Sequence, residues 1–302
     1  MNAPGRIVWL TSFPKSGNTW FRIFLANLAA GEHGPTDINN LDERGGNSCS
    51  RHEFEVATFL DSGLIGHDEI DDLRPQVYRR AVPPAGQRWI KVHDGYTAAP
   101  SGELMFGLPG TRAIYLVRDP RDVAISLAFH NSSTVNEAIA LMNDADAALC
   151  PGLKGVSPQL RQRLLGWSGH VASWLDQTDI PVYCLRYEDL RAEPERHFTA
   201  ALQFAERTAS QTDIQRAVRH ADFGELQRQE AERGFAERMS PMVPFFREGR
   251  VGSWREQLSD EQIARIEDVH ATMMLRLGYG LHTASNALPE SLPNAVRSRL
   301  AR

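Results

Sequence analysis

The residues with the clearest chemical potential lie near the N-terminus, in the turn over residues 11–19. Lys15 offers a full positive charge, and Ser16 and Thr19 offer hydroxyl donors beside the backbone N–H groups of a glycine-containing turn. The turn follows a short apolar run and precedes a segment whose apolar residues have helical spacing. Free N–H groups and the positive end of a helix dipole therefore converge there. This arrangement predicts a site for a phosphate or sulfate group.

Polar residues also stand at the ends of three later apolar runs, each of which is typical of a buried strand. His93 ends the first of these runs, Arg118 follows the second, and Tyr187 follows the third. Helical patterns separate the runs, which indicates parallel βαβ units in one doubly wound sheet. Because ligands of such sheets bind at the carboxyl ends of the strands, we expect Lys15, His93, Arg118 and Tyr187 to line one site.

The elements that must position these side chains follow from the spacing of apolar residues. Strands are expected over residues 6–10, 88–93, 111–117 and 181–185. Helices are expected over residues 20–30, 68–82, 120–129, 135–142, 160–175, 190–206, 211–220 and 258–277. Residues 31–68 have no clear pattern and are expected to be irregular. Residues 223–252 are expected to form a loop over the site.

The composition is typical of a globular chain and narrows the range of partners. Of 302 residues, 42% are hydrophobic and 24% are charged, with a net charge of −5. A general binder of nucleic acid or of an anionic membrane would be basic, so neither is an expected partner. Three widely spaced cysteines form no zinc pattern, and no apolar run suits a secretory signal or a membrane span. These features favour a cytoplasmic protein.

The N-terminal turn is not a Walker P-loop. That motif, GxxxxGK[ST], places its lysine after the last glycine, whereas Lys15 precedes Gly17 and the first glycine is absent. No acidic magnesium pair is recognisable, so no metal is expected. One alternative remains open at this point: a kinase that uses ATP and magnesium.

Three motifs resemble those of the sulfotransferases that depend on 3′-phosphoadenosine 5′-phosphosulfate (PAPS). Residues 11–20, TSFPKSGNTW, resemble the family's 5′-phosphosulfate loop, commonly written TYPKSGTTW. Residues 115–126, YLVRDPRDVAIS, resemble its 3′-phosphate motif, and residues 246–255, FREGRVGSWR, resemble its late RKGxxGxWK motif. The matches occur in the family's order and extend over nearly the whole chain.

The resemblance implies a fold, a donor and a set of donor-binding residues. The implied fold is the P-loop-NTPase-like sulfotransferase fold: an α/β single domain with a central parallel sheet flanked by helices. We expect it over residues 1–285, with a peripheral tail over residues 286–302. PAPS is the implied co-substrate, without a metal, and a small molecule or carbohydrate is the implied acceptor. The implied donor-binding residues are Lys15, Ser16, Gly17, Asn18, Thr19, Trp20, Arg118, Ser126, Tyr187, Phe223, Arg247 and Gly249.

The resemblance also implies how the reaction runs. The sequence KVH at residues 91–93 resembles the family's KTH, whose histidine takes the proton of the acceptor hydroxyl, so His93 is the implied base. Imidazole suits this role because its pKa lies near working pH. Lys15 would lie where charge develops as the S–O bond breaks, and Lys91 shares the face of His93 by strand alternation. The implied reaction is in-line sulfuryl transfer to a hydroxyl or amine. A second alternative is a non-catalytic protein on the same fold that binds a nucleotide such as adenosine 3′,5′-bisphosphate (PAP).

Three residues depart from the family's pattern. Asn18 replaces a commoner threonine, Glu248 replaces a usual lysine, and Asp94 replaces a leucine or a similar residue. We expect Asp94 either to orient His93 or simply to begin the turn. Trp20 resembles a residue that packs on the adenine, although a place in the core fits it equally well. The family's short dimer motif lacks its Thr-Val pair and its Glu here, so the sequence determines neither the oligomeric state nor the acceptor.

Overall fold

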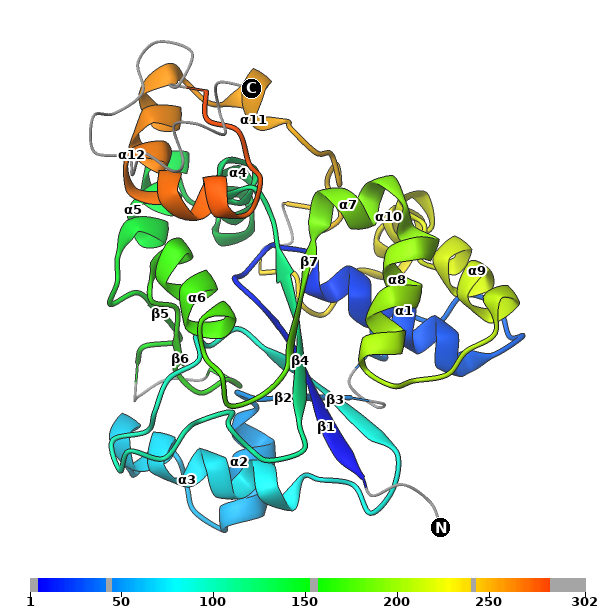
Figure 1. Ribbon diagram of the computed structural model, residues 1–302, viewed down its shortest axis with the longest axis vertical. Helices are drawn as coiled ribbons and strands as arrows, with labels where there is room; N and C mark the ends of the chain where they lie inside the picture. The colour runs from blue at the N-terminus through cyan, green and yellow to red at the C-terminus, as the bar shows by residue number, and fades with distance from the viewer. Residues whose placement is uncertain (1–4, 42–44, 153–156, 240–242, 283–302) are drawn as a thin grey trace.

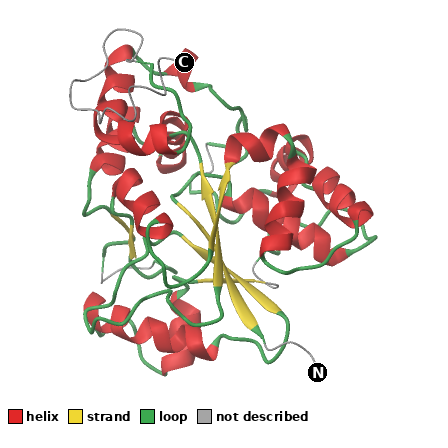
Figure 2. Cartoon of the chain, in the orientation of Figure 1, coloured by secondary structure: helices red, strands yellow, loops and turns green. Residues whose placement is uncertain are grey.

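The computed structural model describes residues 5–41, 45–152, 157–239 and 243–282. A twisted sheet lies at the centre, with helices packed against both of its faces (Figures 1 and 2). The expected fold class, an α/β domain with a central parallel sheet, is confirmed. The predicted domain limit at residue 285 and the tail over residues 286–302 lie outside the described residues.

The central sheet has the strand order β2-β3-β1-β4-β7, and every neighbouring pair is parallel. Its strands are β1 (Arg6–Ser12), β2 (Gly45–Asn47), β3 (Gln87–Val92), β4 (Arg112–Val117) and β7 (Val182–Arg186). The four strands expected from the sequence are β1, β3, β4 and β7, each confirmed to within two residues. Because all the strands are parallel, their carboxyl ends lie at one edge of the sheet.

Alternate residues of each strand face opposite cores, as the pleat of a strand requires. In β1, Ile7 and Trp9 belong to one core and Val8 and Leu10 to the other, and each is at most 1% exposed. The first core is covered by α3 (His67–Arg80), α4 (Pro120–Asn131), α5 (Val135–Asn143), α6 (Gly166–Leu175) and α12 (Asp260–Arg276). The second is covered by α1 (Asn18–Ala30), α8 (Pro194–Phe204), α9 (Gln211–His220) and α10 (Phe223–Arg233), on the right in Figure 1.

The segment 31–68, expected to be irregular, contains β2 and a helix, α2 (Arg51–Thr58). β2 has the sequence Gly-Gly-Asn and pairs with β3, so its neighbour rather than its composition makes it a strand. α2 is capped by Ser50, whose hydroxyl accepts the backbone N–H of Glu53. Phe54 is the one residue of α2 that is fully buried. A single buried residue produces no periodic pattern, so the sequence did not reveal this helix.

Part of the loop expected over residues 223–252 is also helical, because α10 occupies Phe223–Arg233. Asp222 caps this helix by accepting a backbone N–H from its first turn. Its buried positions include the polar residues Gln229 and Glu230, which conceal the amphipathic pattern from the sequence. The prediction of a loop is wrong for these eleven residues.

The helix expected over residues 160–175 begins later, as α6 at Gly166. Leu165 and Gly166 have positive φ values of 62° and 64°, which separate the helix from a short strand, β6 (Gln162–Arg163). β6 pairs antiparallel with β5 (Ala148–Leu149). The residues expected to face the core from this region are confirmed, each with 0% exposure: Leu164, Trp167, Val171 and Trp174.

Two other regions contain an additional break. The helix expected to continue to about residue 206 consists of α7 (Tyr187–Ala192) and α8, separated by Glu193, whose φ of −134° is not helical. Pro194 occupies the first turn of α8, where its missing N–H is tolerated. The expected C-terminal helix is confirmed as α12, and the short helix α11 (Trp254–Gln257) precedes it.

Candidate active site

The turn after β1 has the backbone geometry of an anion cradle. Lys15 and Gly17 adopt left-handed φ values of 68° and 103°. α1 begins at Asn18, and within the described chain no side chain caps its first turn, so its N–H groups remain available to a ligand. A Cβ on Gly17 would lie 2.8 Å from the Tyr187 ring. Glycine is therefore required here both by the conformation and by the close approach of the aromatic ring.

Buried polar atoms without a partner mark this turn as a binding site. Ser16 Oγ, Asn18 Oδ1 and Arg118 Nε have no hydrogen-bond partner in the described part of the chain. Such atoms lose free energy unless a ligand or water satisfies them. Asn18 has a structural role as well, because its Nδ2 donates to Leu10 O at 2.8 Å and fastens the turn to β1.

A cavity of about 500 Å³ lies against the turn and collects the predicted residues from widely separated elements. With the exception of Ser16, which is fully buried behind the loop, each predicted site residue lines this cavity. The expected convergence of Lys15, His93, Arg118 and Tyr187 at the carboxyl edge is therefore seen. Each of them follows the end of a strand: Lys15 follows β1, His93 follows β3, Arg118 follows β4 and Tyr187 follows β7.

His93 lies directly after β3 and is held as a neutral imidazole. Its Nδ1 lies 2.8 Å from Ser12 O and 3.3 Å from Ser12 Oγ. Because a carbonyl oxygen can only accept, Nδ1 must carry the proton, and Nε2 keeps the lone pair. His93 is one of the residues that line the cavity. Burial and the nearby positive charge of Lys91 together lower the pKa of His93 to about 3, although the bond to Ser12 acts in the opposite direction. The residue is thus in the protonation state of a base.

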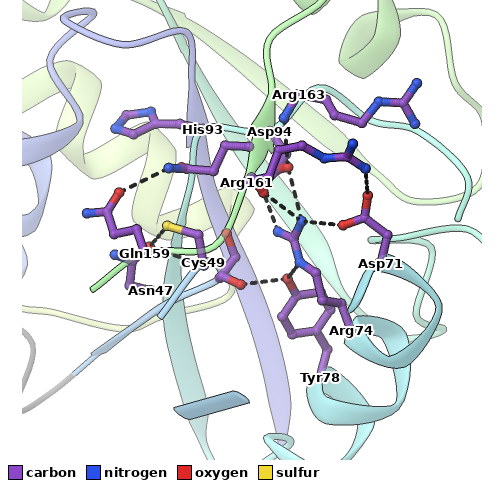
Figure 3. Close-up of polar contacts among 12 residues, drawn as sticks. Asn47, Cys49, Asp71, Arg74, Tyr78, His93, Asp94, Gln159, Arg161 and Arg163 are labelled. Carbon is purple, nitrogen blue, oxygen red and sulfur yellow. Dashed lines mark hydrogen bonds and ion pairs between the residues drawn. The ribbon is translucent and has the colours of Figure 1, made fainter. Parts of the chain in front are cut away.

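Asp94 does not orient the His93 ring. Its carboxylate points to the opposite side of the chain and pairs with Arg74, at 2.7 and 3.2 Å, in the cluster of Figure 3. It also accepts the backbone N–H of Arg163 at 3.1 Å. His93 is instead held through its backbone carbonyl, to which His170 Nε2 donates at 3.1 Å. Of the two expectations for Asp94, the structure favours a role in holding the turn.

Two lysines contribute positive charge to the cavity in different electrostatic states. Burial and the neighbouring Arg118 lower the pKa of Lys15 to about 7. The Lys15 ammonium lies 3.7 Å from the centroid of the Phe245 ring, a cation–π contact that partly replaces its hydration. Lys91 lies two residues before His93 on the same face of β3, and its Nζ is 3.5 Å from Glu237 Oε2.

Arg118 places another cation in the cavity, next to the N-terminal turn. It is 8% exposed, and its Nη atoms donate to two backbone carbonyls, Lys15 O at 3.3 Å and Arg250 O at 2.9 Å. Its guanidinium also stacks over Tyr187, 4.6 Å from the ring centroid. These contacts fix the guanidinium between the N-terminal turn and the late motif, while its Nε remains without a partner in the residues described.

Asp122 holds the late motif over Arg118, a role that the sequence did not reveal. Its carboxylate accepts Gly252 N at 2.7 Å, Ser253 Oγ at 3.0 Å and Trp254 N at 3.0 Å. The spacing of Asp122, four residues after Arg118, is compatible with any helix surface charge, so nothing in the sequence distinguished it. The contacts reach across more than 100 positions of the chain and are visible in the tertiary structure alone.

The cavity lining also includes Ser126 and Arg247. Ser126 is partly buried on α4, two turns after Arg118, and lines the cavity. Arg247 donates to Glu248 at 2.9 Å, and its guanidinium lies 3.9 Å from the centroid of the Phe129 ring. Glu248 therefore neutralises a neighbouring cation where the family's usual lysine would add one.

Aromatic side chains line the cavity together with these cations. Trp20 lines the cavity, packs against Phe198, and donates its Nε1–H to Ala221 O at 2.8 Å. Of the two roles weighed for it, the place in the core is seen, and packing on an adenine stays a prediction. Phe223 begins α10 and lies so close to Gly249, which has a φ of 59°, that a Cβ there would be 2.7 Å from the ring. Gly249 is required for this contact.

Glu237 is the main feature of the cavity that the sequence analysis missed. It follows α10 and places a carboxylate among the cations beside the N-terminal turn. Arg22 Nη1 donates to it at 2.5 Å, and Thr19 Oγ1 donates to it at 3.3 Å. No motif contains Glu237, and 215 positions separate it from Arg22, so no spacing in the sequence could have joined them.

Two kinds of feature are absent from the part of the chain that the structure describes. No group of three or more His, Cys, Asp and Glu side chains there has an arrangement that could hold a metal ion. The described helices also include none that is long and apolar enough to cross a membrane.

The sequence matches a known domain family and several characterised proteins. Residues 6–278 match the sulfotransferase domain family. The chain is 24% identical over 271 residues to cytosolic sulfotransferase 17 of Arabidopsis thaliana, covering 86% of this chain and 71% of that protein. It is also 24% identical over 282 residues to sulfotransferase 1B1 of Mus musculus, covering 90% of this chain and 84% of that protein.

Solved structures share the fold. A mouse sulfotransferase, SULT7A1, complexed with PAP superimposes with a TM-score of 0.57 at 19% identity, over 91% of this chain and 86% of that chain. Retinol dehydratase in complex with retinol and PAP gives a TM-score of 0.57 at 20% identity, over 89% and 81%. The family match covers most of the chain, and the motifs that carry it surround one cavity: the protein is an enzyme of the sulfotransferase family.

Proposed function

We propose that this protein transfers the sulfuryl group of PAPS to a hydroxyl or amine of an acceptor by direct in-line displacement. One observation carries the proposal: a single cavity is lined by two groups of cations and by aromatic side chains. Lys15 and the N-terminus of α1 form one group of cations, and Arg118 with Arg247 forms the other. An adenosine nucleotide with phosphate groups on both its 5′ and 3′ oxygens offers an anion to each group and a ring to the aromatic side chains.

The residues present fit this donor. The turn from Ser16 to Thr19 offers backbone N–H groups and hydroxyls to a 5′-phosphate, and Ser16 Oγ is buried without a partner in the described chain. Arg118, whose Nε is likewise unpartnered, would bind the 3′-phosphate with Ser126 and Arg247. Trp20 and Phe223 would pack on the adenine, and Tyr187 supports Gly17 and Gly249 on either side.

The chemistry is proposed to divide among three side chains. When bound, PAPS supplies an activated sulfuryl group. His93 Nε2 would take the proton from the acceptor hydroxyl or amine, because Nδ1 is bonded to Ser12 O and the residue lines the cavity. The low pKa of His93 reflects burial and the charge of Lys91, so an anionic ligand that offsets Lys91 raises it toward the usual value. Lys15 and Lys91 would stabilise the negative charge that develops during transfer.

The proposed acceptor is a small molecule. Besides the donor-binding residues, the cavity lining includes Leu149, Cys150 and Pro158, which offer a largely apolar surface. Retinol dehydratase has been solved with androsterone and with retinol, which supports an acceptor of this class over a carbohydrate. A cytoplasmic location, in line with the names of the Arabidopsis relatives, belongs to the same proposal.

Transfer of radiolabel from PAPS to a panel of phenols, alcohols, amines and carbohydrates tests the reaction. The expected result is a labelled product whose formation does not require magnesium. Magnesium-dependent ATP turnover without PAP binding would instead establish a kinase. Tight PAP binding with no transfer to any acceptor would establish a nucleotide-binding protein without this activity.

The lowered pKa of Lys15 predicts that PAP binding weakens as the pH rises above about 7. The protonated amine attracts phosphate, so each pH unit above the pKa is expected to lower the affinity by up to about tenfold. Phosphate groups have a second pKa of about 6, so the charge of PAP changes little between pH 7 and 9. Calorimetric titrations in this range therefore report protonation of the protein alone. Lys15→Arg keeps its charge in this range and is expected to remove the dependence. A flat wild-type profile would contradict the prediction.

A further inference from the structure

A carboxylate of the protein lies at the point where the proposed donor needs cations. Glu237 comes from the segment after α10 and lies against the N-terminal turn and β3. Its Oε1 accepts Arg22 Nη1 at 2.5 Å, and its Oε2 lies 3.3 Å from Thr19 Oγ1 and 3.5 Å from Lys91 Nζ. The Arg22 and Lys91 side chains are 9% and 10% exposed, so both charges are largely withdrawn from water.

These contacts keep Glu237 ionised under all ordinary conditions. Burial by itself would raise the pKa of Glu237, but the positive charges of Lys91 and Arg22 outweigh burial and lower it to about 2. Protonation therefore does not release the carboxylate at a pH at which the protein works. Another anion can release it, because an anion competes for the same cations and hydroxyl.

The proposed donor is such an anion. Thr19 and Lys91 are two of the groups assigned above to the 5′-phosphosulfate. The Thr19 hydroxyl has one hydrogen to donate, and it is directed at Glu237. Two anions this close in a partly buried site repel each other strongly. The carboxylate and the phosphosulfate cannot both hold these positions.

We propose that Glu237 is an internal anion that occupies part of the phosphosulfate subsite and that donor binding displaces it. The inference rests on the proposed function and adds a control on it. Without a donor, Lys15, Lys91, Arg22 and Arg118 would repel one another in a buried site, and Glu237 compensates part of that charge. The donor affinity then depends on how much more strongly the donor binds these cations than Glu237 does, and not only on the strength of the anion cradle.

The test compares PAP binding to the wild-type protein and to Glu237→Gln by calorimetry. Glutamine keeps the size of the side chain but loses the charge that competes with phosphate. We expect Glu237→Gln to bind PAP about tenfold more tightly or better, because less of the protein is withheld from the binding-competent state. Glu237→Ala, which removes the side chain, is expected to tighten binding as well and guards against an effect of the amide itself.

Glu256→Gln is the matched control. It removes the same charge from an exposed pair with Arg250, and its side chain is 63% exposed, so PAP affinity is expected to stay at the wild-type value. Equal or weaker PAP binding by both Glu237 variants would overturn the inference while leaving the proposed function in place. Failure of the wild-type protein and of every variant to bind PAP would overturn the proposed function and this inference with it.

Discussion

Replacement of His93 by alanine is expected to lower kcat by about 10²- to 10⁴-fold, the usual contribution of a positioned general base. His93 Nδ1 donates its proton to Ser12 O at 2.8 Å, so Nε2 is the free base in the cavity. Alanine removes the proton acceptor but none of the groups proposed to hold the donor. PAP affinity is therefore expected to remain within a few-fold of wild type.

Initial-rate kinetics with labelled PAPS and calorimetry with PAP separate these two effects. His52→Ala is the matched control, because His52 is an exposed histidine on α2 outside the cavity. It is expected to leave both quantities unchanged. Full activity of His93→Ala would remove His93 from the proposed mechanism, and a large loss of PAP affinity would make it a binding residue.

Replacement of Arg74 by methionine is expected to lower the free energy of unfolding by about 3–5 kcal/mol, the range for breaking a buried ion pair from one side. Arg74 is 1% exposed and donates to Asp94 at 2.7 and 3.2 Å, to Asp71 at 3.3 Å and to the Tyr78 hydroxyl at 2.9 Å (Figure 3). Methionine fills much of the space but leaves two buried carboxylates with less compensating charge.

Urea denaturation measures the change in the free energy of unfolding. Arg196→Met provides the comparison, because Arg196 pairs with Glu193 at 3.1 Å while its side chain is 72% exposed. Exposed pairs of this kind contribute about 0–1 kcal/mol. Equal losses in the two variants would mean that burial of the Arg74 cluster has no special cost. The buried pair of Arg74 and Asp94 also holds the turn that follows His93. A stability loss of about 3–5 kcal/mol would therefore give Asp94 a structural role in this turn.

The sequence by itself determined the parallel sheet and which polar side chains gather at its edge. Apolar runs identify β1, β3, β4 and β7, because a strand covered on both faces is apolar over most of its length. A turn that holds Lys15 and Gly17 before a helix must present free N–H groups to an anion. Parallel strands then force Lys15, His93 and Arg118 to one edge. Each of these conclusions depends on local conformation or on the geometry of a sheet.

The tertiary structure decided the features that depend on distant partners. β2 is a strand because β3 pairs with it, and α10 hides its amphipathic face by burying Gln229 and Glu230. Asp94 stands beside His93 in the sequence, yet strand alternation turns it away to a partner on α3. These side chains acquire their roles through contacts between elements, which neither composition nor periodicity encodes.

The same reason accounts for Glu237, whose role was invisible in the sequence. Lysine and glycine in a turn predict that an anion binds there, since the backbone and one charge suffice. Which anion holds the site without a donor depends on a carboxylate 215 positions away from Arg22. The sequence thus determined that the chain has a cradle for a negative group, and folding decided that the chain supplies one itself, because burial of several cations requires a compensating charge nearby.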